Sequence, residues 1–322
     1  MDDIKSLFSS DEKMYEFVKK ASMLGMCKPI EVMADDDAYA ISLSEYEHII
    51  FIPKTIGRLN ESYRIHKFAD AIKNLNGKLT IVNNNLGIQN ADYMFYEANA
   101  TELDLTYCMF DNLMYAEGMF EASSFKKIDL SNRDFGIVKN ASGLFESCKA
   151  EEIILTNVDF SDLSDASYMF KDVHLKSLDL STIKWNYVKN FEAMFEEAKI
   201  HDLRFNFNGF LDDAWMNSMF QDFETDGDLV LDSFIDGSIR SVEQMFCDCR
   251  ANAIIIKNMN MYSALLTDFM FNGCKAKYVS LTNTYLNEQA YPVDMFKHSE
   301  FKFTTNDNVF KEVYNIYKNN LH

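Results

Sequence analysis

The chain has 322 residues, of which 48% are hydrophobic and 25% charged, with only 11 glycines and three prolines. This composition excludes disordered and collagen-like chains and predicts a folded protein with a substantial core. The 31 basic and 50 acidic residues give a net charge of −19. Such a charge argues against a protein that grips a phosphate backbone, and it is compatible with a basic partner.

Residues 1–77 are predicted to form a small α/β cap. Ser9 and Glu12 fit a capping box at the start of a helix, because each side chain can accept a hydrogen bond from an otherwise free backbone N–H group at the helix N-terminus. Alternating apolar residues predict strands at 39–41 and 49–52, and a second helix is expected around Phe68, Ile72 and Leu75. This segment carries a net charge of −3, so the rest of the chain carries −16.

An apolar–phenylalanine pair recurs nine times after this segment, at steps of 25 residues with a single step of 26. The pairs are Met94-Phe95, Met119-Phe120, Leu144-Phe145, Met169-Phe170, Met194-Phe195, Met219-Phe220, Met245-Phe246, Met270-Phe271 and Met295-Phe296. A fixed period of this length is the signature of a repeat architecture.

A second ladder of apolar–x–apolar triplets runs in phase with the first, from Leu103-Asp104-Leu105 to Val279-Ser280-Leu281. Alternation of this kind predicts one short strand per repeat with one buried face. A short helix-like stretch is expected to end in each Met-Phe pair. Neither piece can bury its apolar side alone, so the repeats must stack and align their strands in a parallel sheet. We therefore predict an α/β, leucine-rich-repeat-like solenoid over residues 78–304.

The clearest repeat copies resemble the BspA-type leucine-rich repeat family. The resemblance rests on Ala166-Ser167-Tyr168-Met169-Phe170, on Leu178-Asp179-Leu180-Ser181 and on Ile128-Asp129-Leu130-Ser131, and it extends over residues 79 to 304. It implies a solenoid used for protein interaction, and many members of the family are surface adhesins.

The C-terminal segment, residues 305–322, is predicted to be a capping helix. Its apolar residues Phe310, Val313, Tyr314, Tyr317 and Leu321 fall on one helical face. Such a face suits the sealing of the last repeat, because an open solenoid end exposes core. A helix that binds a partner is the alternative interpretation.

The candidate binding site is the outward face of the predicted sheet, because residues that flank and separate the buried pair of a strand point away from the core. In the first repeats this face is acidic, and later repeats add apolar residues to it. The candidate residues are Glu102, Asp104, Asp129, Glu152, Ile154, Asp179, Asp202, Asp228, Val230, Ile255 and Tyr278. The alternative for Asp104, Asp129 and Asp179 is a structural role, in which the carboxylate accepts hydrogen bonds from turn amides beside the strand.

The sequence contains no convergent catalytic pattern, so we expect no enzyme activity, no cofactor and no metal. The six histidines are scattered, and neither His-Glu-x-x-His nor Gly-x-Ser-x-Gly occurs. Cys247, Cys249 and Cys274 invite a zinc interpretation, but Cys249 and Cys274 occupy the same repeat position and should stack as neighbours in the core wall. Asp222, Glu224 and Asp226 resemble the start of a calcium loop, but position twelve of that loop is Ser233. A surface turn insertion is the preferred interpretation.

A cytoplasmic location is expected, because residues 1–5 lack a basic signal region and no stretch approaches eighteen apolar residues. The first hypothesis is a scaffold that docks a basic protein surface through the acidic sheet face and acts by occupancy. The second is an inhibitor of phage or mobile-element origin that mimics nucleic acid and blocks the channel of a nucleic-acid enzyme. A surface adhesin is the third. We expect a protein partner, with no direct binding of nucleic acid and no association with a membrane.

Overall fold

A computed structural model describes residues 28–30, 38–44, 47–52, 69–70, 72–73, 75–83, 88–185, 187–207, 213–235, 238–287, 289 and 292–319. The helix predicted from Ser9 lies outside the described residues. Of the helix predicted around Ile72, the described residues 69, 70 and 72 are helical.

The N-terminal segment begins the sheet of the solenoid. Strands β1 (Lys28–Ile30), β2 (Ala38–Ser44) and β3 (Glu47–Ile52) are antiparallel neighbours. Strand β3 then pairs in parallel with β4 (Lys78–Asn83), and β4 pairs in parallel with β5 (Glu102–Tyr107). The two strands predicted in this segment are confirmed as parts of β2 and β3.

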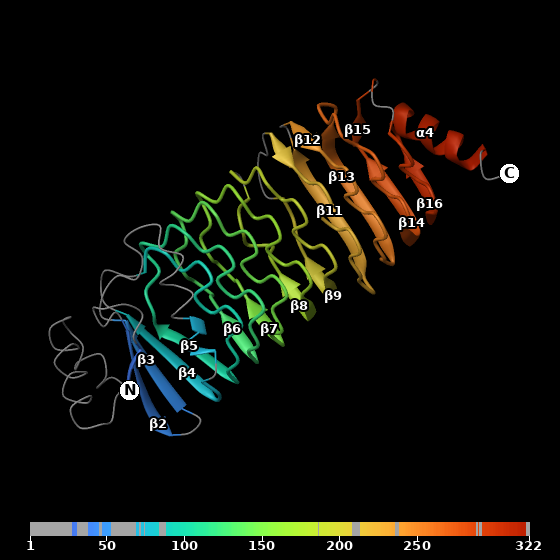
Figure 1. The fold of residues 1–322 in the computed structure, drawn as a ribbon. Helices are drawn as coiled ribbons and strands as arrows, with labels where there is room; N and C mark the ends of the chain where they lie inside the picture. Colours follow the sequence, from blue (N-terminus) through green and yellow to red (C-terminus); the bar gives the residue numbers. More distant parts are fainter. Residues whose placement is uncertain are drawn as a thin grey trace.

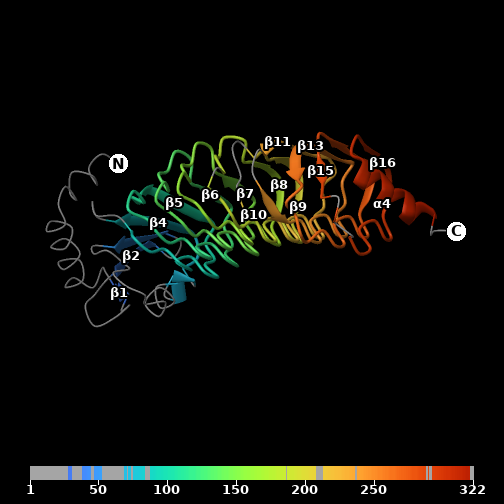
Figure 2. The same ribbon diagram turned by 90° about the horizontal axis from the view of Figure 1, so that it is seen from above.

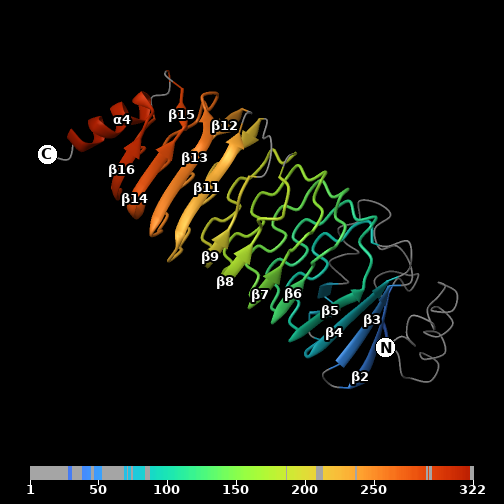
Figure 3. The same cartoon turned by 180° about the vertical axis from the view of Figure 1, so that it is seen from behind.

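One strand per repeat follows, and Figures 1 and 3 show the strands side by side along a single axis. They are β6 (Lys127–Asp129), β7 (Glu152–Ile154), β8 (His174–Asp179), β9 (Lys199–Arg204), β11 (Asp228–Ile235), β13 (Ala253–Met261), β14 (Lys275–Thr282) and β16 (Glu300–Thr305). Paired strands are parallel and join residues one repeat apart, as in Ile128 opposite Ile153 and Leu229 opposite Ile254. The predicted parallel-sheet solenoid is confirmed.

Short strands in the segments that connect sheet and turns complete the coils. These are β10 (Ala214–Trp215), β12 (Ile239–Ser241) and β15 (Tyr285–Leu286). Seen from above, the coils lie along one axis from β4 to β16 (Figure 2).

The prediction that a short helix-like stretch ends in each Met-Phe pair is wrong. Each pair lies in the middle of six consecutive turn residues, for example 167–172 and 192–197. Two residues of each segment adopt positive φ, as Tyr168 at 57° and Asp172 at 53° do, and left-handed residues interrupt a right-handed helix. The molecule is consequently mostly sheet, with little helix.

Alternating hydrogen bonds explain why this turn conformation recurs. In the segment around Met169, the N–H groups of Tyr168, Phe170 and Asp172 donate to carbonyl oxygens of the next coil, at 2.9 Å each. The intervening N–H groups of Met169 and Lys171 donate to the third residue before them. A helix would use every N–H group within the segment, whereas this arrangement uses every second group to join neighbouring coils.

The core is a set of side-chain columns along the solenoid axis. The phenylalanines of the nine pairs stack in one column from Phe95 to Phe296, with neighbouring ring centroids 5.0–5.6 Å apart and interplanar angles of 0–12°. The residue before each phenylalanine is also buried. Full burial of one such side chain contributes roughly 1.5–3 kcal/mol, so the columns account for much of the stabilisation between coils.

The predicted C-terminal capping helix is confirmed as α4 (Asn308–Asn319). Asp307 caps it, because its carboxylate accepts the Phe310 N–H at 2.8 Å. Phe310 is fully buried, and the Tyr314 ring lies 5.2 Å from that of Phe296. The helix therefore covers the aromatic end of the core.

Candidate protein-binding faces

The sequence-predicted site residues all lie on strands of the sheet, on its outward side, which we call the sheet face. Glu102, Glu152, Asp179, Asp202, Asp228, Val230 and Tyr278 are exposed, and Asp104, Asp129, Ile154 and Ile255 are partly exposed. The parallel register aligns them in rows, so that Val230 lies opposite Ile255 and Asp179 lies opposite Arg204.

Three of the predicted acids accept local backbone hydrogen bonds, Asp104 within β5 and the other two at the ends of β6 and β8. Asp104, Asp129 and Asp179 each accept the backbone N–H of the residue two positions later, at 2.9–3.1 Å. Burial acts to raise the pKa of each carboxyl, but hydrogen bonds from the following Thr or Ser, with nearby cations, lower that pKa overall. Their geometry fits the structural role that the Leu-Asp-Leu-Ser motif allowed.

Basic side chains offset much of the negative charge on the sheet face. Lys78 Nζ lies 3.4 Å from both Glu102 Oε1 and Asp104 Oδ2. Lys127 lies 3.0 Å from Asp129. Arg204 reaches Asp179 at 3.7 Å and Asp202 at 4.0 Å. The sheet face is thus a mixed-charge surface rather than a continuous acidic band.

The exposed apolar residues of the sheet face, which we call the apolar row, lie on β11, β13 and β14; Val230 is opposite Ile255, whereas Tyr278 is opposite Ala253. Val230 is 40% exposed and Tyr278 is 39% exposed, with partly exposed Ile255 on the strand between them. Apolar residues beside exposed Asp228 give this part of the sheet face the composition of a small protein-contact surface.

The densest negative charge lies elsewhere, on the outward side of the nine Met-Phe turn segments, which we call the turn face. These segments carry 14 acidic residues and two lysines, Lys171 and Lys297. The acidic residues are Asp92, Glu97, Glu117, Glu121, Glu146, Asp172, Glu192, Glu196, Glu197, Asp222, Glu243, Asp248, Asp268 and Asp294. Counting acids at fixed positions around each Met-Phe pair could have found this face from the sequence, but the assumed helix obscured which positions point outward.

Like charges crowd one another where the first coils stack. Burial raises the pKa of Glu121 to about 7, and the neighbouring carboxylates of Glu146, Glu117 and Glu97 add to the shift. Burial also raises the pKa of Glu146. The turn face therefore changes its charge near neutral pH.

Replacing Glu121 with glutamine is expected to raise the melting temperature at pH 8 by about 2 °C and to flatten its pH dependence. The folded-state pKa of this carboxyl lies above the unfolded value near 4.5, so the native state binds the extra proton. Stability is therefore highest at low pH within this window and falls as pH rises from about 4.5 to about 7. Thermal unfolding followed at pH 5, 6, 7 and 8 measures the effect.

Glu197→Gln is the matched control, because it removes an exposed carboxylate from the same face. It is expected to leave the slope between pH 5 and 8 unchanged. Equal flattening by both variants would show that the slope reflects the total charge of the face and not the site of Glu121.

The cysteines considered for zinc are part of the core wall. Cys249 and Cys274 are fully buried in adjacent coils, and the hydrogen bond between them, together with burial, raises the pKa of the Cys249 thiol. Among the residues that the structure describes, no three His, Cys, Asp or Glu side chains are grouped to hold a metal ion.

The calcium-loop resemblance coincides with the extra residue of the 26-residue repeat. Glu224 pairs with Lys199 at 3.4 Å, and the Asp226 carboxylate lies 2.6 Å from His201 Nδ1. These acids pair with side chains of the preceding coil, as expected for a surface turn.

Within the described parts of the chain, no helix has the length and apolar character needed to cross a membrane.

Comparison with known proteins gives one family match. The family described as "Mycoplasma protein of unknown function, DUF285" matches residues 114–225, a stretch that contains five of the Met-Phe turn segments. Neither the curated proteins nor the solved structures gave a match.

Proposed function

We propose that this protein is a non-enzymatic scaffold that binds a basic protein surface and acts by occupying it. The observation that supports this function is the turn face, where 14 acids stand against two lysines. Stacked coils repeat at about 4.8 Å, so the nine segments extend over roughly 38 Å and carry about one net charge per 3 Å. A regular acidic surface of this size attracts and orients a basic partner.

The repeat motifs support an interaction role. Leu178-Asp179-Leu180-Ser181 and the Met-Phe pairs are similar to the BspA-type repeat, and the matched mycoplasma family covers the same coils. We assign the repeats to this type. Solenoids of stacked repeats present long surfaces that suit protein binding.

An inhibitor that mimics nucleic acid is the second candidate, favoured by the linear charge density of the turn face. About one net charge per 3 Å is close to the one charge per ~3.4 Å along a single DNA strand. A rigid row of this kind fits a channel lined with Lys and Arg. The partner would then be a nucleic-acid enzyme.

The apolar row of the sheet face supplies a second contact. Val230, Ile255 and Tyr278 lie together on three neighbouring strands, and burial of such residues stabilises an interface more than exposed ion pairs do. The sheet face and the turn face can be tested separately because their acids lie on different segments of each coil.

Neutralising four acids of the turn face is expected to weaken partner binding about tenfold. The variant carries Asp172→Asn, Glu197→Asn, Asp222→Asn and Asp248→Asn; all four positions have positive φ, which Asn tolerates. Four exposed charges at roughly 0.3–0.5 kcal/mol each give about 1.2–2 kcal/mol in total, and 1.4 kcal/mol corresponds to tenfold in Kd. The partner is recovered by pull-down from a mycoplasma cytosolic extract, and its Kd is then measured at several salt concentrations.

The matched control neutralises four acids of the sheet face, Glu102→Gln, Glu152→Gln, Asp202→Asn and Asp228→Asn. It spares Asp104, Asp129 and Asp179, whose carboxylates accept backbone hydrogen bonds, so the fold is expected to be preserved. Loss of binding in this variant and not in the other would transfer the site to the sheet face. If a single-stranded oligonucleotide competes with the protein for the purified partner, the mimic is favoured; a partner that binds no nucleic acid favours the scaffold.

A further inference from the structure

Each turn segment donates backbone hydrogen bonds toward the C-terminal end of the solenoid. The Phe246 N–H donates to the Met270 carbonyl, and the Phe271 N–H donates to the Met295 carbonyl, both at 2.8 Å. The residues two before and two after each of these phenylalanines donate in the same way. In the second case, the N–H groups of Phe269 and Gly273 donate to the carbonyl oxygens of Val293 and Lys297. Every coil thus offers three donors to the coil that follows.

The last turn segment, residues 293–298, has no following coil. Its equivalent donors are the N–H groups of Asp294, Phe296 and His298, and none of them meets an acceptor among the residues that the structure describes. Unpaired backbone donors in a partly enclosed site cost free energy until they find an acceptor. The three groups therefore form a row of open hydrogen-bonding positions.

Helix α4 replaces the side chains of a further coil but not its backbone. The rings of Tyr314 and Tyr317 lie 5.2 and 6.5 Å from that of Phe296, which continues the aromatic column. No hydrogen bond joins α4 to the three donors within the described residues. A pocket remains between the helix and the last turn segment.

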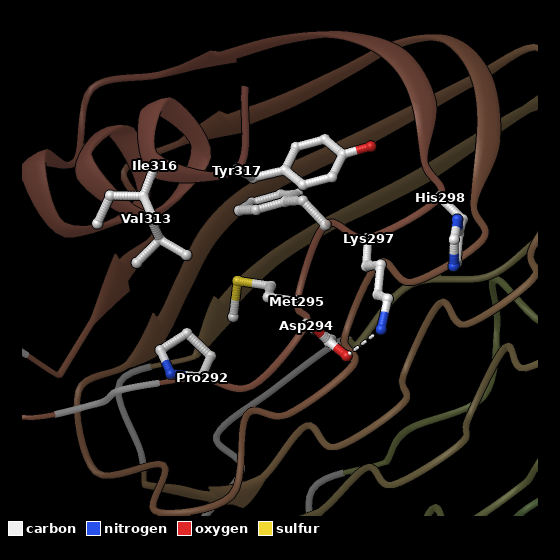
Figure 4. A pocket seen from close by; sticks show the side chains of 9 residues that line it. Pro292, Asp294, Met295, Lys297, His298, Val313, Ile316 and Tyr317 are labelled. Carbon is white, nitrogen blue, oxygen red and sulfur yellow. Dashed lines mark hydrogen bonds and ion pairs between the residues drawn. The ribbon is translucent and has the colours of Figure 1, made fainter. Parts of the chain in front are cut away.

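This terminal pocket has an apolar wall on the helix side. Val313, Ile316 and Tyr317 line it from α4, and Met295 lines it from the turn (Figure 4). Ile316 is 55% exposed, which is high for a branched apolar residue beside a core. Asp294, Lys297 and His298 complete the lining, and the Lys297 ammonium is paired with the Asp294 carboxylate at 2.7 Å (Figure 4).

We propose that the terminal pocket binds an extended peptide segment of a partner protein. Carbonyl oxygens of alternate peptide residues accept the N–H groups of Asp294, Phe296 and His298, and the apolar side chain between them packs on Ile316 and Val313. The edge here belongs to a turn segment, but the principle is shared with strand addition, in which main-chain hydrogen bonds give affinity and a side-chain pocket gives selectivity. The site lies at the C-terminal end of the turn face, to which Asp294 belongs, but it does not rest on the function proposed for that face.

The other open edge of the last coil is less suited to this role. Strand β16 exposes the charged residues Glu300 and Lys302, and charged side chains oppose further strand pairing. Its inward residues Phe301 and Phe303 are already covered by Tyr314. The terminal pocket is therefore the favoured position for an added segment.

Amide-resolved NMR on the full chain tests the proposal. In the free protein, the amides of Asp294, Phe296 and His298 are expected to exchange with solvent at least about 100-fold faster than those of Phe269 and Phe271, which are bonded to the next coil. The probe is the blocked peptide acetyl-Ser-Thr-Leu-Thr-Ser-amide. It should shift the three amide signals and slow their exchange, with a Kd of about 1 mM or tighter. The same peptide with aspartate in place of leucine should bind at least tenfold more weakly.

Ile316→Glu is expected to abolish peptide binding without unfolding the protein, because the side chain is more than half exposed. Ile137→Glu changes a similarly exposed residue far along the chain and should leave the Kd unchanged. Equal binding of both peptides would overturn the proposal. Protection of the three amides that grows with protein concentration would also overturn it, because a second copy of the chain would then occupy the pocket. The same holds if the amides are already protected in the free protein and deletion of residues 320–322 removes that protection, because the chain's own end would then be the occupant.

Discussion

Replacing Phe170 with alanine is expected to lower the free energy of unfolding by about 4 kcal/mol, the middle of the range for a buried phenylalanine. The Phe170 ring is fully buried between Phe145 and Phe195, at centroid distances of 5.4 and 5.5 Å. The substitution opens a cavity and also removes two stacked contacts, each worth roughly 0.5–1.5 kcal/mol beyond burial. Urea denaturation followed by circular dichroism measures the loss.

Phe170→Leu separates the cost of the cavity from the cost of the lost ring stacking. Leucine keeps most of the apolar volume and removes the ring, so its cost is expected to be about 1–2 kcal/mol. A cost of less than about 1 kcal/mol for the alanine variant would mean that neighbouring coils close the gap, and that the phenylalanine column is not what holds them together. Because each coil contacts only its neighbours, the effect should be nearly the same at Phe145 and Phe195.

Replacing Gly118 with valine is expected to cost about 2–3 kcal/mol. Gly118 has a φ of 55°, and a Cβ atom built there would overlap with the Tyr93 ring of the preceding coil. A left-handed conformation costs an ordinary residue roughly 1–2 kcal/mol, β-branching raises that cost, and the ring must move as well. Urea denaturation of Gly118→Val, alone and combined with Tyr93→Ala, measures the cost of the backbone conformation and the cost of moving the ring.

The background variant Tyr93→Ala removes the ring, so that only the backbone cost of Gly118→Val should remain there. Ala193→Gly, at the equivalent position of a later coil with a φ of 52°, is expected to be neutral or slightly stabilising. A neutral Gly118→Val variant would show that the turn segments can adopt another conformation, and it would contradict the hydrogen-bonding pattern that joins the coils.

The turn conformation also decides where charge appears on the surface. Because alternate N–H groups join neighbouring coils, the six residues around each Met-Phe pair are fixed with Met and Phe inward and their acidic neighbours outward. A helix over the same residues would have turned some of those acids toward adjacent segments. The acidic turn face is therefore a consequence of parallel stacking.

The sequence was sufficient to predict the solenoid, its register and its C-terminal helix. A 25-residue period in two ladders can be satisfied only when equivalent residues stack, so Ile153 lies opposite Ile128 and the phenylalanines form one column. The C-terminal helix followed from the spacing of Phe310, Tyr314 and Tyr317. Local periodicity sufficed because every strong contact joins a residue to its copy one repeat away.

The conformation of the turn segments and the charge of each face depend on contacts between coils. The positive φ angles at Tyr168 and Asp172 are stabilised by hydrogen bonds to the next coil, which no window of a single repeat contains. The same holds for the pairing of Lys78 with Asp104 and of Arg204 with Asp179, since these partners come from neighbouring coils. The composition predicted an acidic protein, whereas contacts between coils decide which of its acidic side chains have a basic side chain nearby.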